Sequence, residues 1–434
     1  MVAPKRSPAP VPKTTQETRR PAFNALRHRD FRLMWVGQLV SVTGTQMQLV
    51  AINWHVYLLT KSALALGAVG LVRVVPIILC SLLGGVVADA FDRKRLLVVT
   101  QVLMLLSASA LSLITAGGLQ SVWPIYLLTA LSSAAVAFEA PARQALLPAL
   151  VPEEDFQSAV SLYMIVFQVS MIAGPALAGL LLNSYDPYLI YAINAASFLA
   201  VIIAVTLVRA SGRAVGSETE EASRVSFGAL GEGLRFVWRT PIIVQTMTLD
   251  FIATFFASAT ALLPIFATEI LRVGARGLGL LAAAPAVGSV LTALVMARLG
   301  TLSRQGAVVI GAVALYGAAT VAFGLSRVFW FSLLMLAVMG AADTVSTVLR
   351  QTIRQLSTPN HLRGRMTSVN MIFFMGGPQL GELEAGTVAS LTGSATVSVV
   401  TGGLGCLLAV ALATWMAKSL WRYEGQVRTT ERGP

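Results

Sequence analysis

The sequence predicts an all-α integral membrane protein in which twelve transmembrane helices form two pseudo-symmetric six-helix bundles. The 434 residues are 56% hydrophobic and 12% charged, whereas soluble domains carry about 25% charged residues. The mean hydropathy is +0.73, and the apolar residues come in long runs separated by short polar breaks. About 20 apolar residues cross a bilayer, and such a run in lipid satisfies its own backbone as a helix.

Twelve runs have this length and composition. In chain order they cover residues 31–57, 64–88, 96–116, 122–146, 158–183, 187–209, 242–268, 277–299, 306–325, 328–350, 365–390 and 395–418. Cys80 and Cys406 lie far apart within two of them, so we expect no disulfide and no metal site. Zinc-ligand spacing, a nucleotide-binding glycine loop and a paired catalytic His and Cys are all missing from the sequence, so we expect neither a cofactor nor enzymatic activity.

The basic residues orient the spans. With both termini cytoplasmic, all 32 Lys and Arg residues except six fall in the tails and inner loops. The exceptions are Lys61, Arg272, Arg276 and Arg327 in outer loops, and Arg73 and Arg143 within spans. This asymmetry is the positive-inside rule, so the net charge of +12 indicates membrane topology rather than nucleic-acid binding. We expect a multi-pass protein of a bacterial inner membrane.

The chain divides into five regions. We expect a disordered cytoplasmic tail (1–22), an N-terminal six-helix bundle (23–209), a cytoplasmic linker with a surface helix (210–240), a C-terminal six-helix bundle (241–419) and a second cytoplasmic tail (420–434). The linker is rich in Gly, Ser and Glu. Internal similarity indicates duplication, because Arg143-Gln144 followed by Gly174-Pro175 matches Arg350-Gln351 followed by Gly377-Pro378.

Span 31–57 carries polar residues along one face. Gln38, Ser41, Thr45 and Gln48 recur at three- and four-residue spacing, which places them on one side of a helix. In a bundle this side is expected to line a central cavity. Further cavity candidates are Arg73 in the second span, Phe255 in the seventh and Phe374 in the eleventh.

A cluster of charges follows the second span, in the stretch GGVVADAFDRKRLL. The pattern Gly85-x-x-x-Asp89-x-x-x-Arg93-Lys94-Arg95 resembles the signature loop between helices 2 and 3 of the major facilitator superfamily. The resemblance implies a conformational latch, in which the aspartate and first arginine bind the inner end of helix 11 while the transporter faces outward. Residues 90–92 (Ala-Phe-Asp) depart from the family pattern of arginine, bulky residue and glycine.

The fifth span contains Gly174-Pro175 and Gly179. Pro175 removes a backbone hydrogen bond and bends a helix, and the glycines permit close packing. The segment resembles the glycine–proline motif of drug:proton antiporters of this superfamily, which implies export and a seam that limits proton leak. A proline kink without this role is the alternative.

Ionisable residues within spans are costly and mark function. The proton-coupling candidates are Glu139, Arg143, Asp250, Asp343 and Glu382, with Asp250 and Glu139 preferred. An apolar cavity favours the neutral form of a carboxylate and a nearby arginine favours the charged form, so alternate pairing would load and release a proton. An arginine in span 4 resembles a further family motif linked to proton coupling. Permanent structural ion pairs are the alternative.

Residues 23–418 resemble one subgroup of the superfamily, which contains the enterobactin exporter and macrolide-efflux-like proteins. The matching segments are LRHRDFRLMWVGQLVS, PARQALLPALVP, LLPIFATEI and GLGLLAAAPAVGSV. The resemblance implies a secondary active transporter that exports a siderophore, macrolide or other amphipathic compound by alternating access and proton antiport. The expected partners are a small-molecule substrate, protons and the lipid bilayer, with the protein monomeric. The alternatives are a lysophospholipid or lipid-like flippase, and a non-transporting receptor or scaffold.

Overall fold

The computed structural model describes residues 23–210, 234–299, 304–359, 362–416, 421 and 423, and its ordered elements in these ranges are all helical. The side chains of residues 82–90, 259, 364, 365, 368, 369, 371, 372, 374, 375 and 416 lie outside this description. The first half of the protein contains six long helices. They are α1 (Arg29–Thr60), α2 (Ala63–Ala90), α3 (Arg93–Ala116), α4 (Trp123–Leu146), α5 (Phe156–Leu182) and α6 (Pro187–Leu207).

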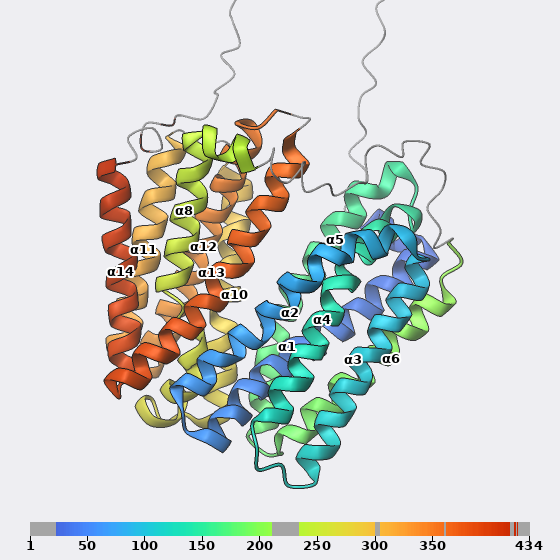
Figure 1. The fold of residues 1–434 in the computed structure, drawn as a ribbon, viewed down its shortest axis with the longest axis horizontal. Coiled ribbons are helices and arrows are strands. Elements are labelled where there is room, and N and C mark those ends of the chain that lie inside the picture. The colour runs from blue at the N-terminus through green and yellow to red at the C-terminus, as the bar shows by residue number, and fades with distance from the viewer. Residues whose placement is uncertain are drawn as a thin grey trace, which may run out of the picture.

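The second half repeats this arrangement. Its helices are α8 (Pro241–Phe256), α9 (Leu263–Ile265), α10 (Gly274–Leu299), α11 (Gln305–Leu325), α12 (Phe329–Leu356), α13 (Arg363–Thr392) and α14 (Ala395–Met416). Short 3-10 turns lie at Asn24–Arg27, Leu147–Ala149, Glu153–Asp155 and Ala259–Leu262 (η4), and a π-helical turn, η5, at Phe266–Ile270. Figure 1 shows the two halves as separate bundles of roughly parallel rods.

Ten helices in the described part of the chain are long and apolar enough to cross a membrane. The two remaining long helices, α1 and α13, have 32 and 30 residues but are not among these ten. Polar residues such as Gln38, Ser41 and Thr45 dilute the apolar character of α1. Ten spans by this test, with two further helices long enough to span, agree with a polytopic membrane protein.

The seventh expected span, 242–268, is not one continuous helix. Helix α8 ends at Phe256, and the chain continues through η4, the short α9 and η5. Pro264 has no N–H and disrupts an α-helical turn that would precede it. Ser258 lies in the break, and its hydroxyl donates to the backbone carbonyl of Pro378 in α13 at 3.2 Å. The expected span is thus present as the apolar segment Pro241–Ile270, but its backbone is not one regular α-helix.

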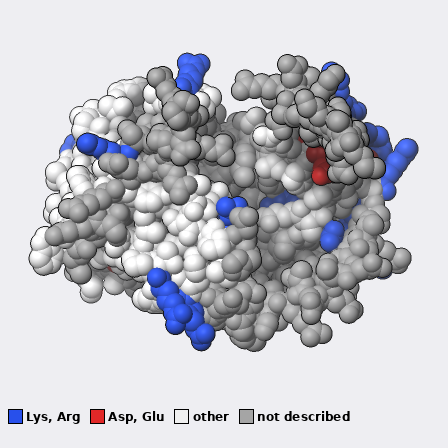
Figure 2. Space-filling model, turned by 90° about the horizontal axis from the view of Figure 1, so that it is seen from above, with Lys and Arg blue, Asp and Glu red and all other residues white. Residues whose placement is uncertain are grey.

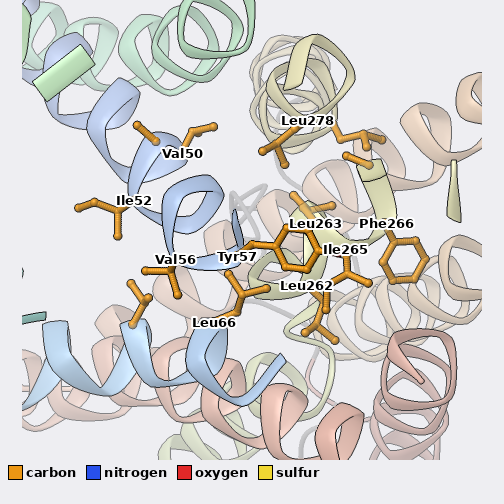
Figure 3. Close-up of a cluster of buried hydrophobic side chains, with 14 of the residues drawn as sticks. Val50, Ile52, Val56, Tyr57, Leu66, Leu262, Leu263, Ile265, Phe266 and Leu278 are labelled. Atoms are coloured by element: carbon orange, nitrogen blue, oxygen red, sulfur yellow. The ribbon is translucent and has the colours of Figure 1, made fainter. Parts of the chain in front are cut away.

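The halves are joined at one end. We name the end where α1 begins, α6 ends and α8 begins the linker side, and the opposite end the far side. In Figure 1 the two bundles meet at the far side, below, and diverge toward the linker side, above. A far-side core of buried side chains from both halves fills the junction. Figure 3 shows its members Val50, Ile52, Val56, Tyr57 and Leu66 from α1 and α2, with Leu262, Leu263, Ile265, Phe266 and Leu278 from the second half.

A short break separates α2 from α3. Helix α2 ends at Ala90, and α3 begins at Arg93. The Asp92 side chain accepts a hydrogen bond from the Arg95 backbone N–H at 3.0 Å, which is a helix N-cap. Asp92 therefore starts α3 and does not act as a free loop carboxylate. Seen from the linker side, Figure 2 shows Lys and Arg at several places on the surface and little Asp or Glu.

Candidate functional site

A cavity with a few polar groups in its wall lies inside the first half. Its volume is about 560 Å³. Three of the residues predicted from the spacing in α1, Gln38, Ser41 and Thr45, line it together with Glu139 and Arg143 of α4. Apolar side chains such as those of Met104, Val136, Phe156 and Phe198 complete the wall. The cavity reaches the linker-side ends of α4 and α5, so its chemistry is that of a mainly apolar pocket with a few polar groups.

An ion pair occupies the wall of this cavity. Arg143 donates to the carboxylate of Glu139 one turn earlier on α4, and Glu139 is buried, with 6% of its surface exposed. The guanidinium of Arg143 also lies over the ring of Tyr163 in α5, 5.2 Å from the ring centroid, a cation–π arrangement. Tyr163 was not predicted as a site residue from the sequence. Both partners lie on one helix, so the pair does not depend on contacts between the halves.

Buried polar atoms in the same cavity lack partners within the described residues. They are Gln38 Nε2, Gln101 Oε1 and Arg143 Nε. Such atoms cost free energy unless water or a ligand satisfies them. Two are donors and one is an acceptor, so the cavity suits a ligand with both kinds of polar group. Gln101, from α3, was missed from the sequence, although an amide inside an apolar run was a visible signal.

A second charge network lies inside the second half. Arg350 on α12 forms an ion pair with Asp250 on α8, in which Arg350 Nη2 lies 2.7 Å from Asp250 Oδ1. Arg354 Nη1 is 3.9 Å from Asp250 Oδ2 and donates to Asn370 Oδ1 of α13 at 2.6 Å. Asp343 Oδ1 lies 3.8 Å from Arg350, with its side chain 48% exposed. This network links α8, α12 and α13 as one body.

Arg350 and Arg354 lie elsewhere than the sequence analysis expected. Arg350 and Arg354 were counted with the inner-loop charges, but they are 1% and 4% exposed. Their spacing from Asp343, seven and eleven residues, puts all three on one helix face. The sequence therefore held a signal, which the positive-inside count obscured.

Two seams of glycine join the halves on the far side. At the α5–α10 seam, a Cβ placed on Gly179 would lie 2.7 Å from Gly279 Cα, and one on Gly279 would lie 2.5 Å from the Pro175 carbonyl oxygen. Gly174 faces the other way, toward Gln46 in α1. The kink motif Gly174, Pro175 and Gly179 therefore packs on both halves.

The second seam joins α2 to α13. Cβ atoms placed on Gly67 and Gly386 would lie 2.6 Å from the Glu382 carbonyl oxygen and 2.5 Å from the Ala63 carbonyl oxygen, respectively. Glu382 Oε2 lies against Gly70 of α2, and Arg73 is one turn beyond Gly70 on the same helix. Two site predictions, Arg73 and Glu382, thus lie at one contact between the halves.

A hydrogen bond also crosses between the halves on the far side. The hydroxyl of Tyr57 in α1 donates to the Glu269 carboxylate in η5, and the ammonium of Lys61 lies 4.5 Å from the centroid of the Tyr57 ring. Tyr57 is buried, whereas Glu269 is exposed at the rim. Neither was a predicted site residue, because 212 positions separate them in the chain.

Replacing Tyr57 with Phe is expected to loosen the far side. The change removes one hydrogen bond worth about 1 kcal/mol while the ring still fills the far-side core, so the balance between far-side closed and open states should move about fivefold toward open. Labelling of a cysteine that replaces Ala389, a buried residue of the far-side core, by a reagent added from the far side measures this. Tyr185→Phe, at an exposed tyrosine outside the seams, is the control, and equal labelling in both variants would contradict the role of Tyr57.

The remaining predicted residues lie elsewhere. Arg93 donates to the Ala145 carbonyl at 2.9 Å and Lys94 to the Val208 carbonyl at 2.5 Å, so both bind within the first half. Gln48 does not line the cavity, because its Oε1 accepts from Asn194 of α6 at 2.6 Å. Phe255 stacks on Phe251. The side chains of Gly85, Asp89 and Phe374 lie outside the described residues, and the latch stays a prediction.

The match to a protein family covers nearly the whole chain. Residues 20–428 fit the family model of the transmembrane secretion effectors. The chain belongs to this family. The chain is 26% identical to the multidrug efflux pump Tap of Mycolicibacterium fortuitum over 369 residues, 83% of this chain and 89% of that protein. It is 24% identical to the enterobactin exporter EntS of Salmonella choleraesuis over 382 residues, 88% of this chain and 87% of that protein.

Solved structures share the fold of this chain. A bacterial homologue of the iron transporter ferroportin, in an inward-facing state, superposes with a TM-score of 0.65 over 91% of this chain and 99% of that chain, at 15% identity. A bacterial homologue of the lysosomal transporter Spinster, also inward-facing, superposes with a TM-score of 0.67 over 91% of this chain and 96% of that chain, at 13% identity. The prediction of a major facilitator transporter is confirmed by the family and the fold.

Proposed function

We propose that this transporter exports an amphipathic small molecule from the cytoplasm across a bacterial inner membrane, driven by protons that move inward. The observation that carries the proposal is the arrangement of the two halves. They are joined at the far side by the far-side core and the glycine seams, and they diverge toward the linker side. Such an arrangement is one end state of alternating access.

The orientation of the protein in the membrane follows from the distribution of its basic residues. Lys and Arg concentrate in the segments of the linker side, and basic residues are enriched in cytoplasmic loops. With that side cytoplasmic, the structure is an inward-open state, and the first-half cavity lies on the path from the cytoplasm. Similarity to a multidrug efflux pump and to an enterobactin exporter supports export and suggests siderophores, macrolides and lipophilic cations as probes.

The cavity suits an amphipathic substrate. Its wall is mainly apolar, and its unpartnered polar atoms include two donors and an acceptor. A ligand that satisfies these atoms while covering the apolar wall avoids the cost of leaving them unpaired. Monomeric function is consistent with a complete pair of halves in one chain.

Uptake into inverted membrane vesicles tests the function. With enterobactin, erythromycin and ethidium as separate probes, we expect vesicles that contain the protein to accumulate at least one probe when their lumen is acidic, because export there is directed inward. A protonophore should reduce uptake to that of vesicles lacking the protein. Uptake that does not respond to the protonophore would contradict proton coupling, and movement of a fluorescent lysophospholipid in place of all three probes would favour a lipid flippase.

A further inference from the structure

Most acids within the spans keep their partners inside one half. Glu139 pairs with Arg143 on the same helix, and Asp250 pairs with Arg350 through two helices of the second half. Rocking of one half against the other leaves both pairs intact. A proton can drive rocking only if the two states bind it with different affinity, so the coupling residue must change its surroundings when the halves move.

Glu382 lies where the halves meet. A Cβ placed on Gly70 of α2 would be 2.6 Å from Glu382 Oε2 and 3.0 Å from its Cβ. The carboxylate of the second half therefore packs against bare backbone of the first half. Separation of α2 from α13 would remove this cover and expose the carboxylate to the solution on the far side.

The charges around Glu382 are few. The elements that pack most extensively against α13 are α2, α8, α14 and η4, and α12 reaches it through the bond of Arg354 to Asn370, twelve positions before Glu382. Helix α8 contributes Asp250, which is held by Arg350, and α14 and η4 contain no Asp, Glu, Lys or Arg. In α2 the charged residues are Arg73 and Asp89, and Asp89 is nineteen positions beyond Gly70. Among the charged residues of these elements, Arg73 is the cation placed nearest to Gly70, against which Glu382 packs.

The seam offers acceptors to a protonated carboxyl group. The Gln379 carbonyl oxygen lies 2.8 Å from the Cβ position of Gly70, and Gln379 Oε1 is buried without a partner among the described residues. Gln379 precedes Glu382 by one helical turn, on the same face. A carboxylic acid donates one hydrogen bond whereas a carboxylate donates none, so the closed seam suits the neutral form better.

We propose that Glu382 binds the coupled proton, an inference that rests on the proton-driven export proposed above. With the far side open, the Glu382 carboxylate takes a proton from hydronium in the external solution, leaving water and a neutral carboxylic acid that the seam can enclose. With the linker side open, the acid gives its proton to cytoplasmic water, because the proton activity of the cytoplasm is lower than that of the external solution even though the closed seam favours the neutral acid. Arg73, one turn nearer the linker side, then balances the charge of the carboxylate.

Glu382→Gln tests the proposal because glutamine is a permanently neutral mimic of the acid. The seam should then close whatever the proton gradient, so the variant should let a probe equilibrate downhill but should no longer accumulate it. Purified protein in proteoliposomes, with the probe from the vesicle assay that accumulates most, gives both rates. Glu384→Gln, two residues along the same helix, is the matched control and should accumulate the probe as the wild type does.

Three other outcomes would contradict either the assignment of the proton to Glu382 or the proposed function. Accumulation by Glu382→Gln would overturn the assignment and leave proton-driven export standing. Loss of downhill movement together with accumulation would give Glu382 a structural role and would also overturn it. A wild type that only equilibrates the probe, at every proton gradient, would instead refute the proposed function itself.

Discussion

Replacement of Gly179 with leucine is expected to reduce transport at least tenfold. A Cβ at this position would lie 2.7 Å from Gly279 Cα and 2.9 Å from the Ala275 carbonyl oxygen, and both are backbone atoms that cannot rotate away. Helices α5 and α10 must therefore separate, and the far side cannot close. A tenfold loss corresponds to only about 1.4 kcal/mol, which is small compared with the free-energy cost of a side chain that overlaps fixed backbone atoms.

Loss of helix stability does not account for this result. Leucine favours a helix over glycine by several tenths of a kcal/mol or more, so the isolated α5 should become more stable. The control is Gly311→Leu in α11, where a Cβ meets nothing within 4 Å, and this variant should transport normally. Transport rates in proteoliposomes make the comparison, and wild-type rates in Gly179→Leu would show that the α5–α10 seam is not needed.

Replacement of Arg350 with methionine is expected to destabilise the protein severely. The change leaves the carboxylate of Asp250, itself 4% exposed, without its closest cation at 2.7 Å. Removal of one partner of a buried ion pair costs about 3–5 kcal/mol. Thermal unfolding in detergent should show a large fall in midpoint, and Arg327→Met, at an exposed residue of the far side, should leave it unchanged.

A double variant separates charge from packing. Asp250→Leu combined with Arg350→Met removes both charges, and replacing a buried pair with apolar residues is often nearly neutral. The double variant should therefore be more stable than Arg350→Met alone. A double variant as unstable as the single one would show that Arg350 acts through packing rather than through its charge.

The sequence predicted those features that depend on spacing along one helix. Gln38, Ser41 and Thr45 share a face and line one cavity, and Glu139 pairs with Arg143 four positions later. Helical periodicity alone determines such relations. The family and the fold followed from hydropathy and from short motifs, which are also local.

Features that join distant helices could not be predicted. Nothing near Asp250 in the sequence indicates that Arg350 approaches it, because the pairing depends on how α8 packs on α12. Gly279 and Gly70 carry no sign of their partners for the same reason. The break after Phe256 was partly visible in Pro264, but the bond of Ser258 to α13 that accompanies it requires the tertiary structure.

The central claim is that the halves rock as units, so that closing one side opens the other. Spin labels on Ser121 and Arg327 report the far side, and labels on Gln157 and Gln355 report the linker side; all four residues are exposed. Pulsed electron paramagnetic resonance in nanodiscs, across a range of pH and with added probe, should show the two distances changing in opposite directions. Two distances that lengthen together, or that stay fixed while transport proceeds, would contradict the claim.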